Sequence, residues 1–417
     1  MKGLASISRW LYYKRYGRAT RRFIPYGMLE VLGPEHEFSI VNNEMKTMPI
    51  VEQVINDYYG KIINFLRLPK FVFRKEFPLH IIELKADKPF KSPELLEESM
   101  QSAILSLLEF TEKKFNAYLL GTGMHPLLRL EETGTRRYDK IAQEFEKIFP
   151  LKRHGWLNVQ SFQINLPYST ESEAVSLYNA LAHLCTYLPA ISAASPICES
   201  QFTPYVDSRL YYYKMKSLEI PSVAGEVIPD YISSFDQFQR EVTGRYSRDL
   251  EMVGVSTKDF TDYVNQRAAV FKTARKAIEI RVMDEQECIK SDVALGCFVR
   301  STIRGLIAMK NEALPHCLLV NDYNSIITKG LEAEVLHPEG ETARQVCQYF
   351  FNLASRYANE NERKYLWIIG KRIKEGNLSD IIRKRVLKKT QKTTFKEAVI
   401  SVYLKLAECL ANNQPYF

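Results

Sequence analysis

Acidic and amide side chains stand at alternate positions in four segments that read as β-strands. In residues 33–40, Glu35 and Glu37 take odd positions, while the apolar Phe38 and Ile40 take even ones. Successive side chains of a strand point to opposite faces, so both acids lie on one side. By the same parity the shared face carries Glu83 and Lys85 in residues 80–85, Ser161, Gln163 and Asn165 in residues 159–166, and Glu279 and Arg281 in residues 277–283. The sequence therefore predicts a sheet with one apolar face and one face of acids, amides and an arginine.

A solvent-facing amphipathic sheet would explain any one of these strands, because antiparallel sheets commonly keep one wet face. Agreement among four strands favours a built site instead, since glutamate is depleted from strands. Carboxylates gathered on one face repel one another unless a cation lies among them, and Mg²⁺ takes hard oxygen ligands. The pattern therefore indicates a site for a metal and a nucleotide.

The elements that must position these residues alternate between strands and helices. Strands are expected at residues 29–41, 71–76, 80–86, 159–166 and 277–284. Ser92-Pro93 offers an N-cap and a first-turn proline, and Thr170 with Glu173 forms a capping box, so each pair predicts the start of a helix. A further helix is expected over residues 292–309, and the pattern is helical from about residue 341 onward. The prediction is an α+β fold, a largely antiparallel sheet with helices on one face and a helical C-terminal region.

Composition excludes several classes of protein. The chain has 417 residues, of which 46% are hydrophobic and 25% charged, which is typical of a globular protein and not of a disordered one. The charge-free stretch 175–198 contains Asn179, His183 and Pro189, and we interpret it as a helix and a turn, not a membrane span. Seven scattered cysteines without a CxxC motif fit a reducing compartment, so a soluble, cytoplasmic protein is expected.

Basic residues gather at both ends of the chain, whose formal net charge is +8. Residues 1–28 are interpreted as a basic arm, with a transit peptide as the alternative, because they are rich in arginine and contain no acid. Residues 371–396 form the second basic segment. Such segments can hold nucleic acid, but no zinc-finger, RNP-like or helix-turn-helix pattern accompanies them. Solvated faces are therefore the prediction, and nucleic acid is not an expected partner.

The chemistry-bearing segments, taken in order, resemble one known family. They are Gly33-Pro34-Glu35-His36-Glu37-Phe38; Glu76 with Glu83; Gly121-Thr122-Gly123-Met124-His125-Pro126 followed by Arg137-Tyr138; residues 159–168; Asp207-Ser208-Arg209; and residues 277–284. The resemblance is to the carboxylate–amine ligases of the glutamate–cysteine ligase type 2 family, on the glutamine-synthetase-like fold. It departs from the family at Gln163, where other members have histidine, and at Asp207, where relatives usually have serine. It implies a catalytic domain at residues 29–310, between the basic arm and a helical C-terminal region at residues 311–417.

The resemblance also implies a reaction and its cofactors, ATP and Mg²⁺. ATP would phosphorylate a carboxylate, typified by the γ-carboxylate of glutamate, and an amine such as cysteine would attack the acyl phosphate to give an amide. The implied metal ligands are Glu35, Gln163 and Glu279 for one Mg²⁺, and Glu37, Glu76 and Glu83 for the other divalent ions. Glu279 and Arg281 would be catalytic, with Arg281 steadying the transferring phosphoryl group, a step that depends on charge neutralisation and positioning. The implied substrate residues are Arg209 and Arg137, suited to a carboxylate, with Asn165 and His125.

Other interpretations stay open beside this one. His36 faces away from the acids by parity and is interpreted as a packed or surface histidine, and Cys198 as a buried thiol. The glycines at 121 and 123 are too short a motif to predict a phosphate loop. The alternative functions are a phosphotransferase of the same fold, or a non-catalytic nucleotide- or nucleic-acid-binding protein that kept the fold. Expected partners are small molecules, a glutamate-like acid and an amine or amino acid, with no membrane, and a homo-oligomer is left open.

Overall fold

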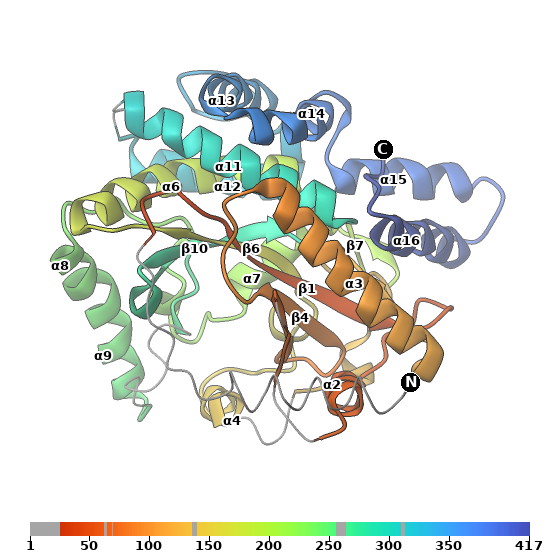
Figure 1. Ribbon diagram of the computed structural model, residues 1–417. Helices are drawn as coiled ribbons and strands as arrows, with labels where there is room; N and C mark the ends of the chain where they lie inside the picture. The colour runs from red at the N-terminus through yellow and green to blue at the C-terminus, as the bar shows by residue number, and fades with distance from the viewer. Residues whose placement is uncertain (1–25, 62–64, 69, 136–139, 256–263, 310–312) are drawn as a thin grey trace.

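The computed structural model describes residues 26–61, 65–68, 70–135, 140–255, 264–309 and 313–417. An antiparallel sheet lies at its centre, in the order β2-β3-β4-β1-β6-β10-β9, with β5 also paired to β1 (Figure 1). Its strands are β1 (Gly33–Val41), β2 (Phe65–Arg67), β3 (Phe71–Lys75), β4 (Ile81–Ala86), β5 (Tyr118–Leu120), β6 (Ser161–Pro167), β9 (Ala269–Lys272) and β10 (Ala277–Asp284). A separate hairpin joins β7 (Ile197–Cys198) to β8 (Gln201–Phe202). The predicted α+β fold with a largely antiparallel sheet is confirmed.

Helices fill most of the remaining described chain. They are α2 (Val51–Tyr59), α3 (Pro93–Phe115), α4 (Lys140–Glu146), α5 (His154–Leu157), α6 (Glu171–Ser192), α7 (Ser208–Met215), α8 (Phe235–Phe238), α9 (Gly244–Met252), α11 (Ile289–Met309), α12 (His316–Lys329), α13 (Ala343–Tyr357), α14 (Glu360–Glu375), α15 (Leu378–Lys389) and α16 (Phe395–Asn412). Both predicted helix starts are confirmed: the Ser92 hydroxyl accepts from the Leu95 amide at 3.2 Å, and Thr170 and Glu173 form a capping box. Among the described residues, none of these helices is both long and apolar enough to cross a bilayer.

Strand register brings the polar residues together. β1 lies between β4 and β6, so that Glu35 is opposite Lys85 on one side and Gln163 on the other. Glu37 is opposite Glu83, and on the next strand along Glu279 of β10 is opposite Asn165 of β6. Because opposite residues of paired strands share a face, the parity prediction is confirmed for all four strands.

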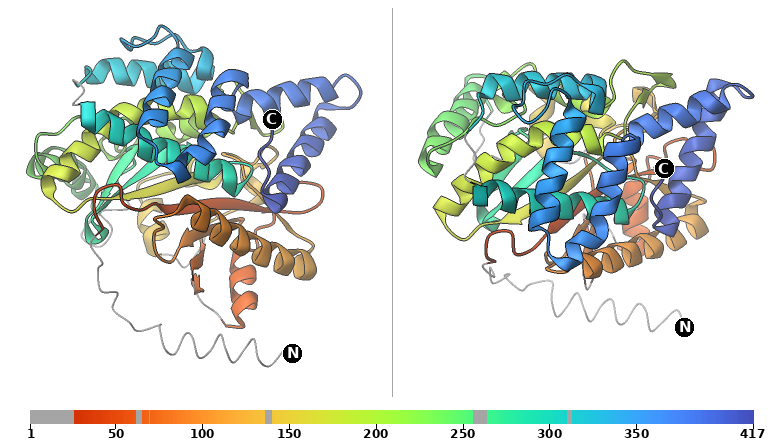
Figure 2. Two further views of the ribbon diagram at one scale, coloured as in Figure 1. Left: turned by 45° about the horizontal axis from the view of Figure 1, so that its top comes forward. Right: turned by 90° about the horizontal axis from the view of Figure 1, so that it is seen from above.

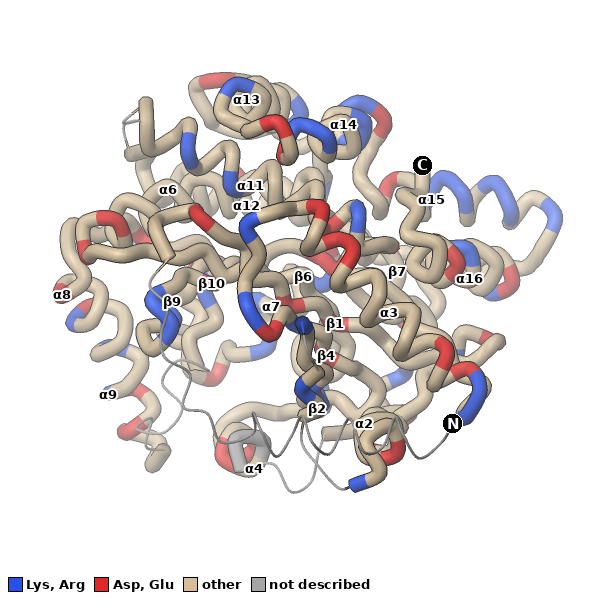
Figure 3. Tube along the Cα trace, viewed as in Figure 1, with Lys and Arg blue, Asp and Glu red and all other residues tan. Residues whose placement is uncertain are grey.

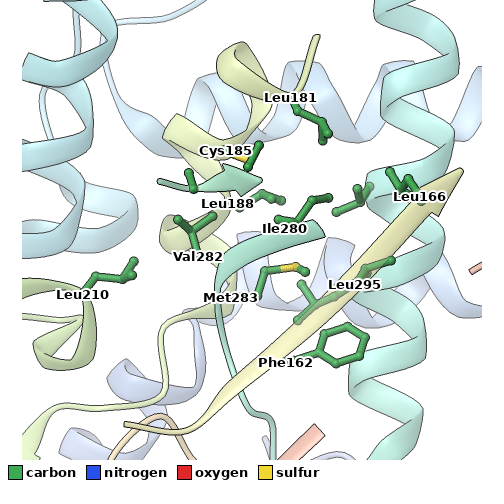
Figure 4. Packing of buried hydrophobic residues seen from close by; sticks show 14 of the residues in the cluster. Phe162, Leu166, Leu181, Cys185, Leu188, Leu210, Ile280, Val282, Met283 and Leu295 are labelled. Atoms are coloured by element: carbon green, nitrogen blue, oxygen red, sulfur yellow. The ribbon is translucent and has the colours of Figure 1, made fainter. Parts of the chain in front are cut away.

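The opposite face of the sheet is apolar and covered by helices. Phe38, Ile82, Ile164 and Ile280, from four neighbouring strands, are at most 1% exposed. Figure 4 shows Phe162, Leu166 and Ile280 from the strands beside Leu181, Cys185 and Leu188 of α6 and Leu295 of α11. Burial of this apolar area fixes which face of each strand points to the helices, and so which face is left for the polar residues.

The C-terminal helices pack onto this helical layer. α13 and α14 lie against α11, and one hydrophobic cluster runs from Leu29 to Leu410 (Figures 1 and 2). The hairpin of α15 and α16 projects to one side, packs its own cluster against β5 and carries Lys and Arg residues along α15 (Figures 2 and 3). The predicted boundary between residues 310 and 311 falls outside the described residues and stays a prediction, while α11 before it and α12 after it belong to the same cluster. The basic arm lies mostly outside the described residues.

Candidate active site

A cavity of about 520 Å³ opens on the polar face of the sheet. Its floor is formed by β1, β4, β6 and β10, and its walls by residues 74–78 and 272–275, by α5, and by the end of α7. The predicted site residues that line it are Glu35, Glu37, Glu76, Glu83, Gln163, Arg209, Glu279 and Arg281. Most of the residues that the sequence singled out for chemistry therefore meet in one place.

Glu37, Glu76 and Glu83 form an acidic group, which we name the outer carboxylates. Glu37 accepts hydrogen bonds from the backbone amide and hydroxyl of Ser161, at 2.7 and 3.1 Å, and from the Gln163 amide at 3.1 Å. Burial raises the pKa of Glu37 to about 8, and the charge of Glu76 adds to the effect. Burial likewise raises the pKa of Glu83 to about 8, against the opposing charge of Lys85. One carboxylate oxygen of Glu83 has no hydrogen-bond partner.

Glu35 and Glu279 form a second acidic group, the inner carboxylates, in a different environment. Glu35 contacts the Lys85 ammonium at 2.8 Å and the Arg275 guanidinium at 3.2 Å. Glu279 contacts Arg281 at 2.7 Å and Lys272 at 3.2 Å. Burial raises both pKa values, but these cations outweigh it and hold the pKa of each carboxyl below its usual value.

The two groups fit a divalent cation unequally. The outer carboxylates offer hard oxygen ligands, one of them a buried oxygen without a partner, and two have raised pKa values that a bound cation would reverse. The inner carboxylates already have their charge compensated by lysine and arginine side chains. Gln163, predicted as a ligand with the inner group, donates its amide nitrogen to Glu37 and to the Ser161 hydroxyl.

Four arginines line the cavity, and two of them, Arg209 and Arg281, were predicted as site residues. Arg209, at the start of α7, donates Nε to Asp284 and Nη1 to the Arg281 carbonyl at 3.2 Å, and its Nη2 has no hydrogen-bond partner. Arg281 donates Nη1 to the carbonyl of Asn265 at 3.0 Å. Each guanidinium is thus held by backbone or carboxylate partners, and the free Nη2 of Arg209 is suited to an anionic oxygen of a substrate.

Lys216 is a cation at the cavity that sequence reasoning missed. It follows the last turn of α7, and its ammonium lies 3.9 Å from the centre of the Tyr213 ring and 4.7 Å from that of Trp156. Burial lowers the pKa of Lys216 to about 7, and the neighbouring charges of Arg281 and Arg209 contribute in the same direction. No motif marked this lysine, because its position depends on α5 packing against α7.

Asp284 holds the arginine side of the cavity in place through its contact with Arg209. One of its oxygens accepts from the Ala194 amide at 2.7 Å and the Ser195 hydroxyl at 2.8 Å, and the other accepts from Arg209. Gly123 lies directly against this carboxylate, and Gly121 lies against the backbone of Gln286. The glycine pair therefore serves close packing at the end of β10.

Two predicted substrate residues stand apart from the cavity lining, and a third lies outside the described residues. Asn165 lies beneath it and donates to Glu35 at 3.2 Å. His125 is fully buried, accepts from the Leu127 amide at 3.2 Å, and is not among the lining residues. Arg137 lies outside the described residues. Their substrate roles stay predictions, and the geometry adds no support for His125.

His36 and Cys198 are buried, as interpreted from the sequence, but each has partners that the sequence did not reveal. His36 stacks on Phe162 at 4.9 Å between ring centres and contacts Glu285 at 3.1 Å. The same Glu285 accepts from the Glu37 backbone amide at 3.1 Å, which helps to hold β1. Cys198 lies 3.5 Å from His154, while burial raises its thiol pKa to about 12, so it stays a thiol.

This sheet, with carboxylates and arginines on one face and helices on the other, has the glutamine-synthetase-like fold that the sequence predicted. The chain belongs to glutamate–cysteine ligase family 2, whose model matches residues 31–404. The match extends beyond the predicted limit at residue 310 and takes in the C-terminal helices as far as α16. Family membership supports an ATP-dependent carboxylate–amine ligase, in line with the resemblance noted from the motifs.

Individual proteins are similar to this chain in sequence or in fold. An uncharacterized protein of Archaeoglobus fulgidus is 38% identical over 388 residues, 93% of this chain and all of that protein. Among solved structures, glutamate–cysteine ligase from Francisella tularensis in complex with AMP has a TM-score of 0.62 at 12% identity, covering 92% of this chain and 90% of that one. A bifunctional glutathione synthetase from Pasteurella multocida has a TM-score of 0.57 at 14% identity, covering 91% of this chain and 52% of that one. At these identities the solved structures establish the fold alone.

Proposed function

We propose that the protein joins the γ-carboxylate of glutamate, or of a closely similar acid, to an amine through an acyl phosphate formed from ATP. The observation that carries the proposal is the placement of five glutamates and four arginines in the lining of a single cavity. Phosphoryl transfer depends on positioning and charge neutralisation, and this cavity offers both signs of charge within one small volume.

The carboxylates would hold the metal. The outer carboxylates Glu37, Glu76 and Glu83 are the residues that would bind Mg²⁺, which offsets charge on the phosphate oxygens when it is bound. Gln163 and Ser161 hold Glu37 in place by hydrogen bonds of 2.7–3.1 Å, so this ligand is already oriented. Glu279 keeps Arg281 directed into the cavity, where the guanidinium would stabilise the charge on the transferring phosphoryl group.

The acid substrate would be held on the arginine side. Arg209 lines the cavity and, among the described residues, its buried Nη2 has no hydrogen-bond partner, while Lys216 adds a second cation on the same side. A carboxylate bound between them would be desolvated by Trp156 and Tyr213, which strengthens its interaction with both cations. The attacking amine would enter on the carboxylate side, where its positive charge is attracted before it loses a proton. The residues do not distinguish cysteine from another acceptor.

A test is the release of ADP from ATP and Mg²⁺ with glutamate, with amines and amino acids supplied one at a time. We expect ADP only when glutamate and one particular amine are both present, together with an amide product in equal amount. Glu279→Gln should abolish release, and Glu251→Gln, on an exposed part of α9, is the matched control that should not.

Three other results would contradict the proposal. ADP release with a phosphorylated amine or guanidino product would support a phosphotransferase instead. Salt-dependent nucleic-acid binding that survives Glu279→Gln, without any ADP release, would support the binding-protein alternative. If ATP binds but no pair of acid and amine is turned over, the fold assignment stands and the proposed ligase function is refuted.

A further inference from the structure

The ammonium of Lys85 lies between the two acidic groups of the cavity. Its Nζ is 2.8 Å from Glu35 and 3.0 Å from Glu83, and its side chain is 12% exposed. Strand geometry fixes this arrangement, because Lys85 lies two residues beyond Glu83 on β4 and opposite Glu35 on β1. A chain cation thus occupies a place between carboxylates that a divalent ion could otherwise fill.

The other cations concentrate on the inner carboxylates. Arg275 contacts Glu35 at 3.2 Å, and Lys272 and Arg281 contact Glu279 at 3.2 and 2.7 Å. With Lys85, four cationic side chains surround two carboxylates. A divalent ion placed there would meet repulsion from all four and would have to displace their hydrogen bonds.

The outer carboxylates are less compensated. Among the described residues, Glu37 accepts hydrogen bonds only from Ser161 and Gln163, which are neutral. Glu83 shares Lys85 with Glu35, and Arg74 approaches its second oxygen no closer than 3.7 Å. In the described part of the chain that buried oxygen has no hydrogen-bond partner, and Glu83 lines the cavity. The negative charge left for an external cation is therefore on this group.

We propose that Lys85 serves as a built-in cation in place of a divalent ion at the inner carboxylates. The protein without nucleotide then binds one divalent ion, on Glu37, Glu76 and Glu83, and the inner pair binds none. This assignment replaces the prediction that Glu35, Gln163 and Glu279 hold a Mg²⁺ of their own. This inference rests on the proposed function only because it takes the cavity as the catalytic site. Its test is independent of activity, because metal binding is measured without ATP or substrates.

The experiment counts Mn²⁺ bound to the full chain without nucleotide, by the loss of the free Mn²⁺ electron paramagnetic resonance signal. We expect one ion for the wild type, and none of comparable affinity for Glu37→Gln. Lys85→Met removes the charge at similar length and should allow a second ion, bound at least about tenfold more tightly than any second ion of the wild type. Lys85→Arg keeps the charge and should retain one ion.

A matched control tests for a general effect of charge. Lys91 pairs with Glu30 at the surface, and its side chain is 70% exposed, so Lys91→Met removes one positive charge far from the cavity. This variant should bind one ion, as the wild type does. Circular dichroism and thermal unfolding of each variant establish that it is folded.

Several outcomes would overturn the proposal. A wild type that binds two ions, or none, contradicts it, as does a folded Lys85→Met protein with unchanged stoichiometry and affinity. If Lys85→Met fails to fold, Glu35→Gln decides the matter: the proposal requires that this variant keep its ion, and loss of the ion refutes it. A protein that binds metal as expected but releases no ADP retains this inference and loses the proposed ligase function, so the two failures are distinguishable.

Discussion

Gly123 lies so close to the carboxylate of Asp284 that a Cβ atom at position 123 would overlap with it. Asp284 in turn holds the guanidinium of Arg209 at the cavity. We predict that Gly123→Ala displaces Asp284, lowers the free energy of unfolding by about 1–3 kcal/mol and weakens binding of the acid substrate. Chemical denaturation and the KM for glutamate would measure both effects. Gly134→Ala, where the new Cβ would reach only ordinary contact at 4.0 Å, is the control and should change neither.

Lys216 gives the cavity a specific dependence on pH. Because burial and two arginines lower its pKa to about 7, the ammonium is half-neutral near neutral pH and should lose its charge as the pH rises. Binding of glutamate should therefore weaken above about pH 7 in the wild type, as measured by calorimetry. Lys216→Met should weaken binding by about ten- to a hundredfold at pH 6.5, the effect of losing one charge-assisted hydrogen bond. If the variant retained the pH dependence of the wild type, Lys216 would not be its source.

The outer carboxylates predict a second dependence on pH. Glu37 and Glu83 have pKa values of about 8 in the metal-free fold, above the value of about 4.3 for an unfolded chain. Their contribution to stability is thus present below pH 4 and is lost as the pH rises through about 8. A bound cation reverses this loss, so Mg²⁺ should raise the melting temperature more at pH 8.5 than at pH 6.5. An equal shift at both pH values, or a larger one at pH 6.5, would contradict the prediction.

A histidine pair should make the fold sensitive to mild acid. His183 of α6 lies 2.8 Å from His337, and burial lowers their pKa values to about 3 and about 4. Below about pH 6.5 these two histidines take up protons in the unfolded chain but not in the folded chain. The free energy of unfolding should therefore fall as the pH decreases from 6.5 towards 4. Urea unfolding at pH 7 and pH 5 would measure the loss. His337→Gln should show a smaller loss than the wild type, and an equal loss would assign it to other groups.

The polar face was predictable because it follows from a local rule. Alternation along each strand places Glu35 beside Glu37 and Glu279 beside Arg281 whatever the rest of the chain does. The same parity also included Lys85, but its role depends on register, because only the pairing of β4 with β1 brings it to Glu35. A position on a face can be inferred from one segment, while a contact between strands requires the fold.

The residues that were missed depend on contacts distant in sequence. Arg275 reaches Glu35 across 240 positions, and Lys216 owes its place to Trp156 on another helix. The strands that went unpredicted are short: β2, β5 and β9 of the sheet have three or four residues each, and β7 and β8 of the separate hairpin have two. Too few residues alternate in such short segments for periodicity to be detected.

The central place of β1 has a consequence for biosynthesis. β1 ends at Val41, yet its partner β6 begins at Ser161, and β10 beyond it begins at Ala277. At translation rates of about 5–20 residues per second, β6 is made roughly six to twenty-four seconds after β1, and β10 is made later still. During the first interval the Gly33–Glu35 part of β1 lacks its β6 partner on the nascent chain, and the apolar face of β1 awaits α6 and α11. The strand that carries Glu35 and Glu37 is thus made early but obtains its partners late. Chaperones would have their longest opportunity to act on this strand.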